Sequence, residues 1–274
     1  MNKRVLSSSY IGVESFLVDV EVDISNGLPN FSIIGLGDTA ISESKDRIRT
    51  ALKNSGFKLE PKKIIVNLSP AGIKKEGAHF DLPIAVGIMM AMGFLKDRYS
   101  ILDNYLFLGE LSLTGEIKRV RGALNSVIFA KEKGYRGVVL PLENYQEAIL
   151  IKGVDIIPVK NLQEVGEFIS KNIVKSVQEK IVVSEEKEEL DFSDVKGQED
   201  VIEAALLAAA GGHNMLMIGE PGCGKTMIAQ RISTILPEMS EEECLEVTKI
   251  YSISGLLSNG HSLVKNRPFR APHH

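Results

Sequence analysis

The residues with the clearest chemical potential form one glycine-rich segment, residues 219–226. Its pattern, G-x-x-x-x-G-K-T, is that of a phosphate-binding loop when a strand precedes it and a helix follows it. An apolar run at 214–218 comes before it, and an amphipathic pattern follows it as far as Pro237. We therefore predict a strand–loop–helix unit rather than a chance glycine turn. The segment consists of Gly219, Glu220, Pro221, Gly222, Cys223, Gly224, Lys225 and Thr226.

The residue types in this segment suit phosphate chemistry. Glycines allow backbone N–H groups to converge on phosphate oxygens, and the helix N-terminus adds partial positive charge. In such a loop the Lys225 ammonium reaches the β- and γ-phosphates, and the Thr226 hydroxyl helps to coordinate Mg²⁺. The pattern predicts ATP and Mg²⁺ as ligands. We interpret Cys223 as a small loop residue, with redox sensitivity as the alternative.

A second segment, Phe192 to Gln198 (FSDVKGQ), begins 27 residues before Gly219. It resembles the F-x-D-V-x-G-Q motif that precedes the phosphate loop of AAA+ ATPases and lies near the adenine. The resemblance implies that Val195, Gly197 and Gln198 stand on the adenine side of a bound nucleotide.

The elements that must carry these residues alternate between strand and helix patterns. Apolar alternation predicts a strand over 18–24, and a second strand at 31–34 is expected to complete an antiparallel hairpin. Asp38 and Thr39 can cap the next helix, which Gly56 ends. The first 170 residues or so thus predict an α+β or α/β domain. Further strands are expected at 62–68, 105–108, 137–140, 155–159 and 215–218, and further helices at 82–94, 123–133, 144–150, 162–170 and 199–210.

Composition sets broader limits. The chain has 274 residues, 44% of them hydrophobic, and a net charge of −4, so a globular protein without a strongly basic character is expected. Two cysteines make no disulfide framework, which favours a reducing cytoplasm, and no signal peptide or membrane span is expected. Residues 179–200 carry nine acids and three lysines, a charge of −6 that is typical of an exposed linker. We predict domains at 1–172 and 192–274, joined by an acidic linker at 173–191.

The two domains together resemble the YifB/ComM family of magnesium-chelatase-like AAA+ proteins, and the match runs over nearly the whole chain. The terminal FRAPHH segment also resembles magnesium chelatase motor subunits. Family members are hexameric, ATP-driven DNA helicases that promote branch migration in competence and recombination, so the resemblance implies DNA and a homo-hexamer as partners. The matching segments are SNGLP at 25–29, VNLSPA at 66–71, KEG at 75–77, DLPIA at 81–85, FLGEL at 107–111 and LTG at 113–115.

The first domain alone resembles the proteolytic domain of Lon proteases, a ribosomal S5 domain 2-like fold, in residues 109–117 and 137–141. Lon-type proteases use a serine nucleophile and a lysine base. No serine stands in the segment 77–81, and Leu124 stands where the lysine is expected. The resemblance thus implies the fold without the protease. His79 and Asp81 are interpreted as loop and helix-cap residues, with a metal or acid–base pair as the alternative.

The remaining charged groups are interpreted as structural. Ser240 and Glu243 fit a capping box, and the lysines at 62–63 and 74–75 and the basic run 118–121 are expected on solvated faces. No Asp occurs among the 48 residues after Thr226, so no Walker B carboxylate is available there. We expect a fragment of a longer protein that hydrolyses ATP only at background level. The alternatives are a magnesium chelatase motor subunit and a non-catalytic docking protein.

Overall fold

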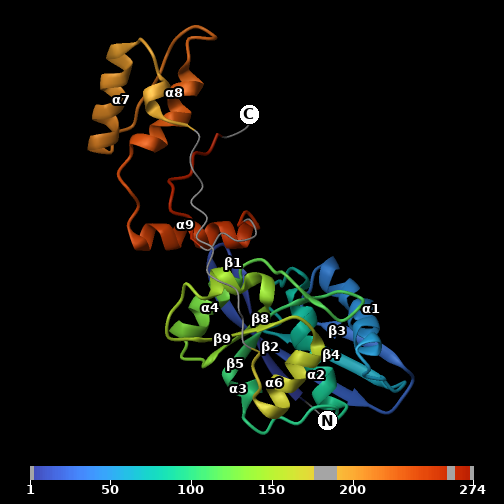
Figure 1. Ribbon diagram of the computed structural model, residues 1–274. Coiled ribbons are helices and arrows are strands. Elements are labelled where there is room, and N and C mark those ends of the chain that lie inside the picture. The colour runs from blue at the N-terminus through green and yellow to red at the C-terminus, as the bar shows by residue number, and fades with distance from the viewer. Residues whose placement is uncertain (1–2, 176–189, 258–262, 272–274) are drawn as a thin grey trace. The chain divides into compact units, whose positions relative to one another are not determined.

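The computed structural model describes residues 3–175, 190–257 and 263–271. By contacts along the chain it divides into two units, residues 1–182 with 249–262, and residues 183–248 with 263–274. Each unit is described by itself. Figure 1 shows the elements, and among the described residues no helix is long and apolar enough to cross a membrane.

The first unit is built on a mixed sheet in the order β3-β4-β2-β1-β5-β8-β9, which confirms the predicted mixture of α/β and α+β structure. Its strands are β1 (Lys3–Ile11), β2 (Glu14–Ser25), β3 (Asn30–Ile34), β4 (Lys63–Ser69), β5 (Tyr105–Phe107), β8 (Gly137–Pro141) and β9 (Asp155–Val159), with a separate pair β6 (Glu110–Leu111) and β7 (Ile117–Lys118). Its helices are α1 (Thr39–Asn54), α2 (Asp81–Ala91), α3 (Ile101–Asn104), α4 (Ala123–Glu132), α5 (Tyr145–Ala148) and α6 (Leu162–Lys171), with short 3₁₀ turns η1 (Ala78–Phe80) and η2 (Leu142–Asn144).

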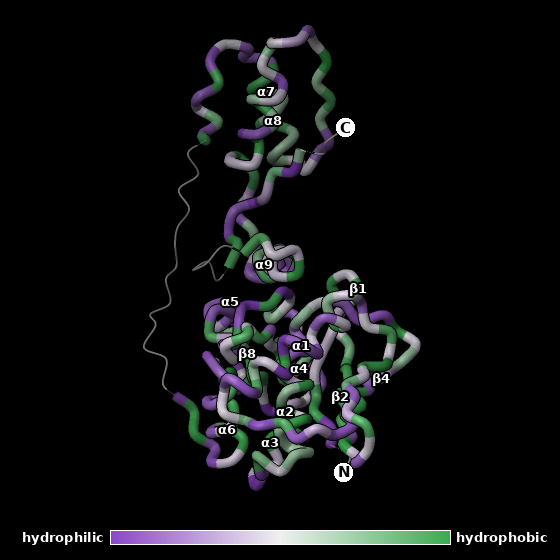
Figure 2. Tube along the Cα trace, turned by 90° about the vertical axis from the view of Figure 1, so that its right-hand side faces the viewer, coloured by the Kyte–Doolittle hydropathy of each residue, from purple (hydrophilic) through white to green (hydrophobic). Residues whose placement is uncertain are grey.

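Helices cover both faces of this sheet. Val5 of β1 faces α2, because a Cβ added at Gly87 of α2 would lie 3.7 Å from Val5 and 2.5 Å from Val22. Tyr10 lies five positions further along β1, so it points to the opposite face, where it contacts Gly122 at the start of α4. Besides the strands, α2 contacts α1, β6 and η1. It is therefore surrounded by other elements, which explains why Asp81 to Met90 are all buried and why the helix has no polar face. In Figure 2, which colours the chain by hydropathy, α2 is drawn mainly in the hydrophobic colour.

The predicted hairpin between β2 and β3 is wrong. β4 lies between them, antiparallel to β2 with Val66 opposite Val22, and parallel to β3 with Ile64 opposite Phe31. Every second residue of β4 is buried, so one face of the strand points into the core. Pairing with β2 and β3 satisfies backbone N–H and C=O groups on both edges of β4. The short β3 is left at the edge of the sheet.

Two other predictions about the first unit also need correction. Asp81 was expected to cap α2, but Phe80 holds the cap position and Asp81 is the first helical residue. Lys74 is exposed as expected, whereas Lys75 is fully buried. The Lys75 ammonium donates to the carbonyls of Gly35 (3.0 Å) and Pro70, and burial lowers its pKa. Lys75 therefore joins the loops that follow β3 and β4 instead of facing solvent.

The second unit has a small core made by Phe192, Val195, Ala205 and Ile228. Its elements are η3 (Phe192–Asp194), α7 (Glu199–Gly211), α8 (Lys225–Ile232) and η4 (Ser233–Ile235), and α9 (Glu241–Ser254) begins here. The capping box expected before α9 is present: Glu243 N donates to Ser240 Oγ at 3.2 Å and Ser240 N donates to Glu243 Oε2 at 2.9 Å.

Candidate functional site

The loop 219–226 joins an extended segment to α8. Gly224 is the N-cap of α8, and Lys225 and Thr226 are the first two helical residues. Gly222 and Gly224 have φ angles of +85° and +91°, a left-handed conformation that side chains disfavour. These two glycines therefore bend the backbone so that the chain enters α8 directly from the loop. The hydroxyl-bearing Thr226 is exposed there.

The side chain of Lys225 folds back over the loop. Its Nζ donates to the carbonyls of Gly219 at 2.7 Å and Glu220 at 2.8 Å, and lies 3.4 Å from the Cys223 sulfur. Cys223 itself is exposed. A cation held inside a glycine loop, at the positive end of a helix, forms a concentrated positive site for an anion.

The segment with the predicted adenine-side residues lies against this loop. Gln198 Nε2 donates to the Cys223 carbonyl at 3.1 Å, although the two residues are 25 positions apart. Gly197 and Gln198 adopt positive φ angles of +70° and +56° where the chain turns into α7. Val195 is only 5% exposed and packs in the core of the second unit. It therefore supports the segment and offers little surface to a ligand.

An ion pair that the sequence reasoning did not identify holds this segment on α8. Arg231 of α8 donates to Asp194 Oδ2 from Nε and Nη2, both at 3.2 Å. Asp194 also accepts from Asp191 N at 3.4 Å, while Asp191 accepts from Ser193 N at 2.7 Å, which closes a capping box around η3. Asp194 is part of the FSDV motif, so the sequence marked it as a residue of interest. The sequence did not indicate its partner, because Arg231 lies 37 residues away.

The prediction of a strand at 215–218 is wrong. The segment is assigned to no strand in the second unit as described. Met215 and Met217 pack against the core, while Leu216 and Ile218 are 84% and 89% exposed. The period-two pattern is therefore realised as an extended segment, but no neighbouring strand pairs with it among the described residues.

The Lon-like segment of the first unit contains buried polar groups in place of a nucleophile and base. His79 Nε2 lies 3.1 Å from the Ser8 carbonyl, and burial lowers the His79 pKa to about 4. Asp81 binds Arg47 through bonds of 2.9 and 3.2 Å, and burial raises its pKa to about 6. Leu124 is fully buried on α4. His79 and Asp81 thus have separate structural partners, and the described residues contain no group of three acidic, histidine or cysteine side chains suited to a metal.

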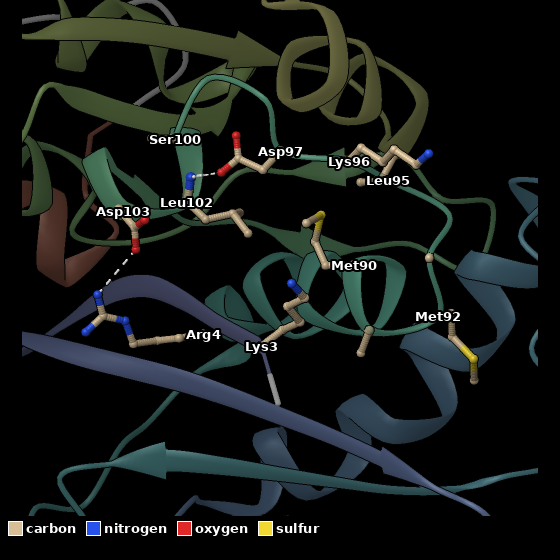
Figure 3. Close-up of a pocket in the computed structure, with 12 residues that line it drawn as sticks. Lys3, Arg4, Met90, Met92, Leu95, Lys96, Asp97, Ser100, Leu102 and Asp103 are labelled. Carbon is tan, nitrogen blue, oxygen red and sulfur yellow. Dashed lines mark hydrogen bonds and ion pairs between the residues drawn. The ribbon is translucent and has the colours of Figure 1, made fainter. Parts of the chain in front are cut away.

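A pocket of about 750 Å³ lies in the first unit, where α2 ends and β1 begins. Figure 3 shows the Lys3 side chain reaching between Met90 and Leu102. At its rim Arg4 is paired with Asp103 at 3.4 Å. Asp97 accepts from the backbone N–H of Leu102 at 2.9 Å. Both acids are thus already bonded, and the pocket belongs to a different unit from the loop 219–226.

Comparisons with known proteins match two separate regions of the chain. A family model described as "Subunit ChlI of Mg-chelatase" matches residues 20–144, and one described as "Magnesium chelatase, subunit ChlI" matches residues 191–274. The chain is 39% identical to competence protein ComM of Haemophilus influenzae, over 98% of this chain and 53% of ComM. It is 41% identical to the YifB protein of Escherichia coli, over 96% of this chain and 51% of YifB.

The likeness to Lon is confined to part of the chain. Lon protease 2 of Bacillus subtilis is 36% identical over 133 residues, which cover 47% of this chain and 23% of that protease. The chain thus spans about half the length of ComM and YifB and a smaller part of Lon. Both family regions and the relatives that match nearly the whole chain agree with the predicted family: the chain belongs to the magnesium-chelatase-like family that includes ComM and YifB.

Proposed function

We propose that the second unit binds ATP through the loop 219–226. The observation that carries the proposal is the position of the Lys225 ammonium beside the N-terminus of α8. Within the described residues, it bonds two loop carbonyls and a thiol sulfur and no carboxylate. Phosphate oxygens are stronger partners for an ammonium than neutral carbonyls, because the bond is between opposite charges. Lys225 then binds the β- and γ-phosphates, while the amides of the loop bind the remaining oxygens.

The chain's own groups fit a magnesium ion that arrives with the nucleotide. The Thr226 hydroxyl is exposed in the first turn of α8, next to the residue that binds phosphate. A hydroxyl is a hard oxygen ligand of the kind Mg²⁺ accepts, and Mg²⁺ is commonly bound by few protein groups together with substrate phosphates. Mg²⁺ would supply neutralisation of phosphate charge. Gln198 and the segment around it would form the adenine side of the site.

We further propose that the longer protein uses this site to drive movement along branched DNA as a homo-hexamer in the cytoplasm. Support comes from the 39% identity to a protein named for competence. The alternative is a motor subunit of magnesium chelatase, which the descriptions of the two family models favour. Binding of forked DNA by the full-length protein, with and without ATP and at stated salt, separates these functions, because phosphate contacts weaken steeply with salt.

Isothermal titration of the chain with ADP and Mg²⁺ tests the nucleotide site. We expect Lys225→Ala to weaken binding by at least tenfold, because the variant loses a charge-assisted contact to phosphate. Lys265→Ala is the matched control, since Lys265 is exposed and lies outside the loop. Equal affinities of the Lys225→Ala variant and the unmodified chain would contradict the assignment.

A further inference from the structure

Residues 249–257 form a distinct part of the first unit. They follow the second unit's residues 183–248 in the chain, yet their contacts place them with residues 1–182. They comprise the last turns of α9 and the residues after it. Ser252 is 3% exposed and Leu257 is 4% exposed, so this short segment is inserted into its surroundings rather than resting on a surface.

The centre of the contact is the carboxylate of Glu147 on α5. Its Oε2 accepts from Ser252 Oγ at 2.6 Å, and its Oε1 accepts from Asn144 Nδ2 at 2.6 Å. Arg119 Nη2 lies 3.8 Å from Oε1. Glu147 is 3% exposed, and burial raises its pKa. A carboxylate at this depth depends on its hydrogen-bond donors, because a buried acceptor without a partner is costly.

The backbone of the segment is recognised at the same place. Gly122 N donates to the Ser252 carbonyl at 3.1 Å, so Ser252 is held through both its side chain and its backbone. A Cβ at Gly122 would lie 2.7 Å from the Tyr10 ring and 3.6 Å from Ile253. The glycine at 122 is thus required by the Tyr10 ring and by its φ of +71°, whereas Ile253 of the segment lies at ordinary contact distance.

We propose that Glu147, with Asn144 and Gly122, forms a latch that reversibly holds residues 249–257 on the first unit. Two features make the latch reversible. The segment is held at this point by the Ser252 hydroxyl on Glu147 and by the Ser252 carbonyl on Gly122 N. Departure of the segment would expose the carboxylate to water rather than leave it buried and unpaired. The latch thus gives this part of the unit two alternative states, with Ser252 bound or released.

The proposal has a consequence for the extent of the first domain. A chain ending at residue 172 contains the receptor residues Gly122, Asn144 and Glu147 but not the segment that they bind. The Lon-like unit is therefore completed by residues of the region that matches magnesium chelatase, 191–274.

Hydrogen exchange of the full chain, followed by mass spectrometry, tests the latch. Ser252→Ala removes the donor, and Glu147→Leu keeps similar bulk without an acceptor. Each is expected to speed exchange of the amides at 252–257 by on the order of tenfold to a hundredfold, the effect of losing a hydrogen bond to a charged group. Adding Ser252→Ala to Glu147→Leu should have no further effect on the segment, because the Ser252–Glu147 bond is already lost.

Matched controls lie close by. Ser254 donates to Ile250 of its own helix and is exposed, and Glu143 is an exposed acid on η2. Ser254→Ala and Glu143→Leu should leave exchange at 252–257 unchanged. Slow exchange at β8 and β9 reports that the sheet is intact. The latch is refuted if Ser252→Ala leaves the segment as protected as before, or if it loosens the sheet and the segment equally.

Discussion

Replacing Arg47 by alanine should destabilise the first unit strongly. Asp81 is fully buried and its carboxylate is bound to Arg47 by contacts of 2.9 and 3.2 Å. Its pKa of about 6 leaves it ionised at pH 8. Opposite charges about 4 Å apart interact by roughly 4 kcal/mol at an effective dielectric constant near 20. Removing one partner of a buried pair costs about 3–5 kcal/mol. We therefore expect a loss of about 3–4 kcal/mol in the free energy of unfolding at pH 8.

The loss should depend on pH in a defined direction. The folded-state pKa of Asp81 is raised, from 3.8 to about 6, so its contribution to stability is present at low pH and falls as pH rises through the folded pKa. Without Arg47 that pKa rises further. Below pH 6 the folded protein holds Asp81 protonated with or without Arg47, so the difference between variant and unmodified chain should shrink toward about 1 kcal/mol, the value of ordinary hydrogen bonds.

Urea unfolding followed by tyrosine fluorescence measures this loss in the first unit alone. The chain has no tryptophan, and its six tyrosines all lie within residues 1–182 and 249–262. Arg49→Ala is the matched control: Arg49 is exposed on the same helix, and a change of under about 0.5 kcal/mol is expected. The reasoning is refuted if Arg47→Ala and Arg49→Ala are equally mild at pH 8, or if the Arg47→Ala loss is the same at pH 5 and pH 8.

Three shorter predictions concern other residues. His79→Leu should reduce the loss of stability on acidification. Burial lowers the His79 pKa from 6.5 to about 4, so the unmodified chain loses up to ~3 kcal/mol of folding free energy as pH falls through that range, because the unfolded state takes up the proton first. Identical urea midpoints for both proteins between pH 7 and 4 would contradict this. Iodoacetamide should modify exposed Cys223 before buried Cys244 and abolish nucleotide binding, as mass spectrometry and ADP titration would show, with Cys223→Ala protected. Gly224→Val should weaken ADP binding at least tenfold, because φ is +91° there, whereas Gly134→Val, at an exposed turn with φ +76°, should leave binding unchanged.

Local pattern was enough to locate most elements of the chain. Alternation of apolar residues predicted β2, and Asp38, Thr39 and Gly56 predicted the ends of α1. The loop 219–226 could be identified because its function needs fixed residue types at fixed spacing within eight positions. The missing serine in the Lon-like segment was visible for the same reason. These properties depend on backbone preferences and side-chain periods that act over a few residues.

The choice of partners was decided only by tertiary structure. The sequence could not show that β4 separates β2 from β3, that Lys75 is buried on backbone carbonyls, or that Asp81 binds Arg47 34 residues away. It also could not show that Ser252 meets Glu147 across 105 positions. Each of these contacts results from packing the whole sheet and its helices at once. The pattern of apolar and polar residues determines which face of an element is buried. The residues that contact this face come from distant parts of the chain, so only the folded structure identifies them.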